Sequence, residues 1–254
     1  MKIKTIVIGL VIGLTLASCG TEMKLATRFV DNASQVHAAV YFPEAAKVTL
    51  VKDEHGNATR VLDSLDQNAF LDIMYAAYAA QLRSYGVDVY IPEDQDHVEV
   101  DSLHWLVVFT QMEIQGRITT YTDEYYDFVN TYEYQVPLNT VNVAAWFDIN
   151  DGEWHPTLFY EHNLMEDFKS SVVRKDGEYK YEYSVDEMST DDIYNYAVFL
   201  GKLYADYTFT DMMNKYVGAE MTKQNSAPRF KIRWDPQEKS FFFVDEGEGF
   251  IELD

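Results

Sequence analysis

The stretch SLDQNAFLDIMYAAYAAQLRSYGVDVYI, residues 64–91, decides the fold class. It opens with capping-box spacing between Ser64 and Gln67, and apolar residues then recur every three or four positions in two adjacent stripes. Gly86 ends this pattern, and Val87–Ile91 follows as a short strand. Because both stripes are apolar, the sequence predicts a buried helix that leads directly into a sheet.

Longer strands are predicted after this helix. Leu103–Phe109 is apolar at both parities, which is typical of a strand in the middle of a covered sheet. Tyr132–Leu138 and Val141–Ile149 place their apolar residues at opposite parities. A bulge near Pro137–Thr140 is therefore expected to keep one face of this segment buried.

A second helix and two hairpins complete the pattern. Ser189 and Asp192 have capping spacing, and the apolar residues of Ile193–Tyr207 follow a period of 3.6. A short separate helix is expected at Thr210–Tyr216. The ordered region is expected to begin at 38–42, where Pro43 interrupts any strand pairing. One hairpin is predicted at 47–62 around Glu54–Asn57, and another at 230–244 around Asp235–Pro236.

These elements predict an α+β fold. No linker, internal repeat or low-complexity stretch interrupts residues 37–254, so they are expected to form a single α+β domain. Its sheet should be mostly antiparallel or mixed, and two main helices should cover it. The chain is 47% hydrophobic and 15% aromatic, which excludes a disordered protein.

The amino terminus has the features of an export signal. Lys2 and Lys4 precede an apolar run, Thr5–Ala17, which suits a signal peptide and is short for a membrane span. The run ends in Leu16-Ala17-Ser18-Cys19-Gly20, which resembles the lipobox of bacterial lipoproteins. This resemblance implies cleavage after residue 18 and lipid on Cys19, the only cysteine of the chain.

The same resemblance implies a location. Residues 1–18 would be a cleaved signal peptide, and residues 19–36 a lipid-anchored tether that is polar from Gly20 to about Asn32. Several acyl chains on Cys19 are enough for stable membrane anchoring. In the best-known sorting pattern, Asp after the lipidated cysteine retains a lipoprotein at the inner membrane. Gly20 therefore implies the outer membrane of the cell envelope, and we expect the periplasmic face.

The charge of the chain excludes two kinds of binding. Lys and Arg number 20 against 42 Asp and Glu, for a net charge of −22, which becomes −24 without the two lysines of the signal. Such a charge repels nucleic-acid phosphates and anionic lipid headgroups, so neither a nucleic-acid partner nor peripheral membrane binding through a basic patch is expected. With no cysteine after Cys19, the mature domain has neither an intrachain disulfide nor a thiol nucleophile.

The order of elements resembles that of transport-associated envelope lipoproteins. These include auxiliary lipoproteins of ABC-type lipid transporters and the lipopolysaccharide-assembly lipoprotein that plugs its outer-membrane barrel. They also include the amino-terminal domain of TolB-type proteins. The resemblance lies in Ala69–Gln115, mainly Tyr78–Val87 followed by Leu103–Glu113. It implies an auxiliary part of a larger assembly. The Tyr-rich middle, Tyr121–Tyr134, and the elements after the second helix depart from those families.

Two acidic stretches contain residue types that can bind metals. His97, Glu99 and Asp101 alternate, with Asp94, Asp96 and His104 nearby, but a solvated acidic loop explains them better than zinc-ligand spacing. Asp148–Gly152 resembles the start of a calcium-binding loop. However, an EF-hand loop needs Gly at its sixth position and Glu at its twelfth, and this chain has Glu153 and Phe159 there. No metal, cofactor or catalytic residue is therefore assigned.

An aromatic and acidic segment is the candidate binding surface. It comprises Tyr121, Tyr125, Tyr126, Tyr132 and Tyr134, interleaved with acids. These rings would either cover the sheet or present a surface to a sugar, a peptide or a protein. Two functions stand: a non-enzymatic envelope lipoprotein that binds a partner protein, lipid or glycan, or a lipid-anchored glycan hydrolase that uses two of the many carboxylates.

Overall fold

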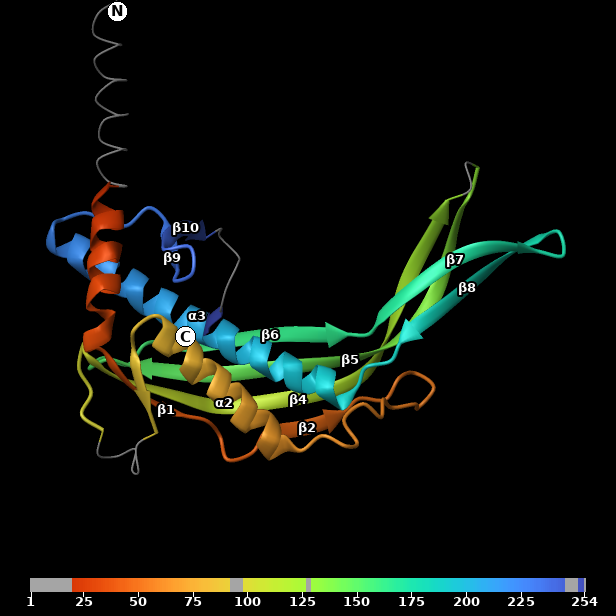
Figure 1. The fold of residues 1–254 in the computed structure, drawn as a ribbon, viewed down its shortest axis with the longest axis horizontal. Helices are drawn as coiled ribbons and strands as arrows, with labels where there is room; N and C mark the ends of the chain where they lie inside the picture. Colours follow the sequence, from red (N-terminus) through yellow and green to blue (C-terminus); the bar gives the residue numbers. More distant parts are fainter. Residues whose placement is uncertain (1–19, 92–97, 127–128, 245–250, 254) are drawn as a thin grey trace, which may run out of the picture.

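The computed structural model describes residues 20–91, 98–126, 129–244 and 251–253, and it confirms a single α+β domain. A mixed sheet has the strand order β11-β6-β5-β4-β1-β3, with β2 also paired to β4 (Figure 1). Its strands are β1 (His37–Tyr41), β2 (Lys47–Leu50), β3 (Asp88–Tyr90), β4 (His104–Tyr126), β5 (Thr131–Asn150), β6 (Thr157–Met165) and β11 (Ile251–Leu253). Two further hairpins are β7 (Asp167–Lys175) with β8 (Glu178–Asp186), and β9 (Lys231–Asp235) with β10 (Ser240–Val244).

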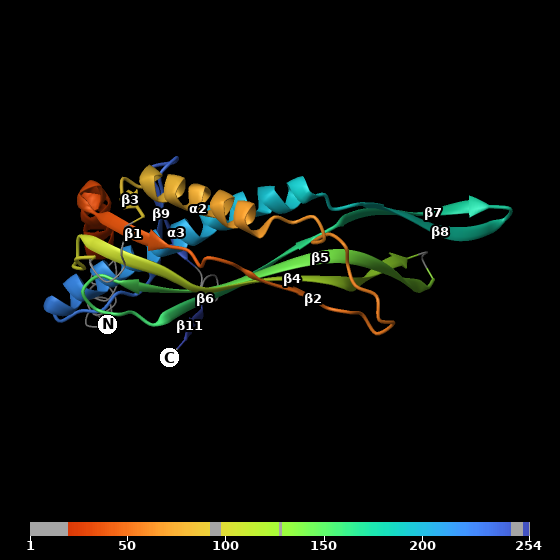
Figure 2. The same ribbon diagram turned by 90° about the horizontal axis from the view of Figure 1, so that it is seen from below.

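Helices α2 (Gln67–Ser84) and α3 (Thr190–Lys223) lie together on one face of this sheet (Figure 2). Aromatic rings from both helices and the two central strands meet in the core, where Tyr78 and Tyr204 each contact Phe109. Gly201 allows the close approach of the helices, since a Cβ there would lie 2.3 Å from the Met74 carbonyl oxygen. Both predicted main helices are thus present.

The helix caps differ in detail from those predicted. Ser189 and Asp192 form the expected capping box of α3. At α2 the N-cap is Asp66, whose side chain accepts hydrogen bonds from the Asn68 and Ala69 amides. The hydroxyl of Ser64 instead forms a hydrogen bond with the hydroxyl of Thr190. The helix predicted separately at 210–216 is part of one continuous 34-residue α3.

The segment expected to be a polar tether is a packed helix. Residues 20–32 are helical, and the 3-10 turn η1 (Ala33–Gln35) joins them to β1. Ala26 is fully buried, and Phe29 stacks on Trp105 at 6.1 Å and contacts Phe209 and Tyr216. The interpretation of residues 20–32 as a tether is corrected, because their apolar side chains fill the core beside the start of β4.

Two strand predictions also fail. The hairpin expected at 47–62 is reduced to a turn with a single antiparallel bridge between Lys52 and Ala58, because β2 pairs in parallel with β4 and residues 59–62 form no strand. The turn itself exists, with Asp53 accepting from the backbone amides of His55 and Asn57. The expected bulge near Pro137–Thr140 is absent as well. β5 pairs continuously with β4 there, and the register shift of this pair lies at Phe109/Gln111.

Candidate functional site

Strands β4 and β5 extend far beyond the helices that cover the rest of the sheet (Figures 1 and 2). Their described distal parts, residues 117–126 and 131–139, pair only with each other. The β7–β8 hairpin, residues 167–186, runs beside them, and the ends of the two hairpins diverge in Figure 1. We call these two hairpins the fork, with a β4–β5 prong and a β7–β8 prong.

Local sequence explains the β7–β8 prong. Asp176 and Gly177 form its two-residue turn, with φ of 54° and 85°. Two successive positive φ angles are the backbone of a type I′ turn, for which Asp-Gly is a preferred pair. A tight turn fixes the register of the nine-residue strands on either side, so the prong is a long ribbon rather than a loose loop.

The two prongs touch through aromatic and polar side chains. Tyr134 stacks on Tyr181 with ring centroids 3.9 Å apart and planes within 4°. Tyr121 contacts Phe168 at 5.2 Å. Asp123 joins the prongs by accepting from Ser170 Oγ at 2.6 Å and Tyr181 Oη at 2.8 Å. These hydrogen bonds, with that from Ser170 the stronger, lower the pKa of the Asp123 carboxyl.

All five tyrosines predicted as a binding surface lie in the β4–β5 prong. Tyr134 is half-buried against Tyr181, and Tyr121 contacts Phe168, so two of the rings pack against the other prong. Tyr125 faces Tyr132 across the strand pair, with the rings 6.5 Å apart. Tyr121, Tyr126 and Tyr132 remain 43%, 64% and 40% exposed. The segment therefore combines packing and surface roles.

The β7–β8 prong adds rings that sequence reasoning missed. Tyr179 is 72% exposed and Tyr183 46% exposed. The guanidinium of Arg174 lies 5.9 Å from the ring centre of Tyr179, its cross-strand neighbour. The Asp176–Gly177 pair was the available signal for this hairpin. Of the six tyrosines that are more than a third exposed among the described residues, five lie in the fork.

A buried carboxylate holds the end of the fork that joins the body of the domain. Glu166, between β6 and β7, is 5% exposed. It accepts from the Asn139 backbone amide at 2.7 Å, from the Asn139 side chain at 2.9 and 3.0 Å, and from the Met188 amide at 3.0 Å. It thus ties the start of the β7–β8 prong to β5 and to the residue before the cap of α3.

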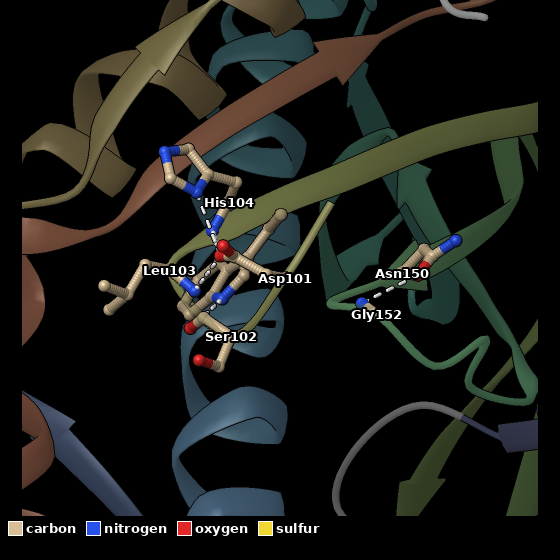
Figure 3. Close-up of polar contacts among 7 residues, drawn as sticks. Asp101, Ser102, Leu103, His104, Asn150 and Gly152 are labelled. Atoms are coloured by element: carbon tan, nitrogen blue, oxygen red, sulfur yellow. Dashed lines mark hydrogen bonds and ion pairs between the residues drawn. The ribbon is translucent and has the colours of Figure 1, made fainter. Parts of the chain in front are cut away.

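The acidic loops considered as metal sites are organised by protein donors. Asp101 accepts from the Leu103 and His104 amides and contacts His104 Nδ1 at 2.9 Å, which closes the bend before β4 (Figure 3). Asn150 accepts from the Gly152 amide in the neighbouring turn. His97 lies outside the described residues. Among the described residues no three His, Cys, Asp or Glu side chains are grouped as metal ligands.

The carboxyl groups bear on the glycan-hydrolase alternative. A hydrolase with two carboxylates needs one of them kept protonated by a raised pKa. Where the pKa of a described carboxyl group is shifted, it is lowered, as for Asp53, where the largest cause is the hydrogen bond from the Asn57 side chain.

In the part of the chain that is described, no helix combines the length and apolarity of a membrane span.

Comparison with known proteins adds no assignment. No protein-family model matches the chain, and no curated protein matches it.

Proposed function

We propose that this protein is a lipid-anchored envelope lipoprotein whose fork binds a partner protein. It would be a non-enzymatic binding or assembly component. The observation that carries the proposal is the fork itself, because a long pair of hairpins with exposed tyrosines is costly to keep ordered in water unless it makes contacts elsewhere.

The distance between the ends of the molecule supports this division of roles. The packed helix of residues 20–32 contacts the start of β4 through Phe29 and Trp105. The roughly 20 residues from Trp105 to Tyr126 span about 65 Å of extended strand. A lipid on Cys19 would therefore sit at one end of the molecule, and the fork would reach a partner well away from the anchor.

The chemistry of the fork favours a protein partner. Tyrosine offers a large apolar ring with a hydroxyl at its edge, and such rings are enriched at protein interfaces. The strand edges of the β4–β5 prong and of the β7–β8 prong also offer backbone donors and acceptors, to which an extended partner segment can pair. A lipid or glycan ligand is a less direct match, because the exposed rings are spread along two ribbons.

The anchor is tested by Cys19→Ser. This change should abolish both metabolic labelling with a fatty-acid probe and retention in the membrane fraction. Gly20→Asp is the companion variant, and it should keep the label but move the protein from the outer to the inner membrane. Labelling that persists in Cys19→Ser would contradict the lipoprotein assignment.

The binding role is tested by affinity purification from crosslinked native membranes. Tyr132→Ala with Tyr179→Ala should reduce recovery of a specific partner, because interface tyrosines often carry much of the binding energy. Phe199→Ala is the matched control, since Phe199 is a similarly exposed ring (47%) on α3 and outside the fork. Equal loss in both variants, or no partner in any sample, would count against the fork as the binding surface.

A further inference from the structure

We propose that the β9–β10 hairpin is a membrane-seating surface that inserts aromatic rings into the headgroup region of the bilayer beside the lipid on Cys19. This inference rests on the proposed lipid anchor but concerns a different end of the molecule from the fork. Its carriers are Phe230, Phe242 and Phe243, which are 49%, 50% and 57% exposed.

These rings gather close to the start of the described chain. The Arg229 amide donates to Glu22 Oε1 at 2.7 Å, which joins the residue before Phe230 to the first turn of the helix that follows Cys19. Phe230 and Phe243 contact each other at 5.0 Å. Figures 1 and 2 show this helix and the β9–β10 hairpin at the same end of the molecule, opposite the fork.

The hairpin is held rigidly enough to present the rings. The side-chain amide of Asn214 on α3 donates to the Ile232 carbonyl at 2.7 Å and accepts from the Ile232 amide at 2.8 Å. Ile232 is fully buried, and Trp234 packs on Phe241 at 4.7 Å. The hairpin thus has packed contacts with the body. Phe242 and Phe243 also line a cavity beside Leu203 and Tyr207 of α3, and each keeps half or more of its surface exposed.

The charge around these rings is mixed. Residues 221–244 contain five Lys or Arg and two acids, a local charge of +3 in a chain of −22. Basic residues near a membrane are attracted to anionic headgroups. The ten residues that follow contain five acids, which brings residues 221–254 to −2, and Lys223 and Arg233 are paired with Glu220 and Asp206. The apolar rings and their place beside the start of the described chain, rather than charge, therefore point to a bilayer. Phenylalanine is among the apolar side chains that segments lying in the membrane interface bury there.

The consequence is a fixed orientation. Because residues 20–32 form a packed helix rather than a tether, a lipid on Cys19 would hold this end of the body against the bilayer. A second contact through the phenylalanines would restrict rotation about the lipid. The fork would then point in a defined direction relative to the membrane.

The test uses the unlipidated mature chain carrying Cys19→Ser, which has no other cysteine. An environment-sensitive dye is attached at Phe243→Cys or, as control, at Tyr179→Cys in the fork. Vesicles of phosphatidylethanolamine and phosphatidylglycerol are added. The dye at position 243 should shift to the blue and be quenched by brominated lipids, and the dye at position 179 should do neither. Equal responses at both positions would overturn the proposal.

A second measurement separates binding from labelling artefacts. Replacing all three phenylalanines by Ser should weaken vesicle flotation on the order of 100-fold, about fivefold per half-exposed ring. Phe243→Ser alone should give about fivefold, which keeps the test valid where the triple variant misfolds, and Phe199→Ser should give no change. If the triple variant and Phe243→Ser both float with vesicles at the wild-type level, the seating surface is refuted.

Failure of this inference is distinguishable from failure of the anchor. Fatty-acid labelling of the full chain in cells reports Cys19 alone. A labelled chain without vesicle contact at Phe243 overturns the seating surface and leaves the lipoprotein assignment intact. An unlabelled chain whose Phe243 still contacts vesicles overturns the anchor and supports the surface.

Discussion

Glu166→Ala should destabilise the protein and loosen the β7–β8 prong. The side chain is almost fully buried and receives four hydrogen bonds from Asn139 and Met188. Removal leaves two backbone amides without their acceptor, at about 1–3 kcal/mol each, so a total loss of roughly 2–6 kcal/mol is expected. For a domain of this size that lowers Tm by about 10 °C.

Glu166→Gln sharpens this prediction. It keeps the volume of the side chain but replaces one acceptor oxygen by an NH₂ group that faces donors. We expect a loss smaller than that of Glu166→Ala yet clearly measurable. Glu178→Ala, an exposed acid on the same prong, is the control and should change stability by no more than about 0.5 kcal/mol.

Urea denaturation gives the free energy of unfolding, and hydrogen exchange locates the change. Exchange should accelerate in β7 and β8 before it does so in α2 and α3, because Glu166 holds the root of the prong. A Glu166→Ala protein as stable as the Glu178→Ala control, with unchanged exchange in β7, would refute the reasoning.

Three further predictions follow from particular contacts. Gly201→Ala should cost about 1–3 kcal/mol or more by forcing a Cβ onto the Met74 carbonyl. Gly218→Ala, whose Cβ would meet only Pro228 Cγ at 3.9 Å, should be neutral or stabilising in denaturant unfolding. Asp123→Asn should widen the distance between spin labels on the two prongs. In the wild type the same widening should appear only as pH falls below about 4, since hydrogen bonds lower the pKa of Asp123 and its carboxylate is lost on protonation. Burial lowers the pKa of His162, so the unfolded chain binds the proton more readily; stability should fall as pH drops below about 6.5, and His162→Gln should flatten that part of the profile.

The helices were predictable because their signals are local. The Ser189 capping box and the period of Ile193–Tyr207 identify α3 without knowledge of the rest of the fold. The parallel pairing of β2 with β4 was not predictable in this way. It joins residues 47–50 to residues 113–116, and no adjacent turn announces such a pairing.

The packed helix at residues 20–32 and the β7–β8 prong were not predicted, although the sequence contains a signal for each. Leu25, Ala26 and Phe29 have helical spacing and pack in the core, but the nearby lipobox favoured a tether. The β7–β8 prong has few consecutive apolar residues, because it is covered on only part of one face. Its Asp176–Gly177 turn was the remaining sign of a hairpin. The tyrosines of the β4–β5 prong were predictable as a cluster, and their partners across the fork were not.

The central claim is that the fork is the surface that meets a partner protein. The most direct test places a photo-crosslinking amino acid at Tyr132, Tyr179 or, as control, Phe199 in the full chain, and illuminates intact cells. The proposed function predicts a discrete crosslinked product of one partner from Tyr132 and Tyr179 and none from Phe199. The same product from all three positions, or none from either fork position, would contradict it.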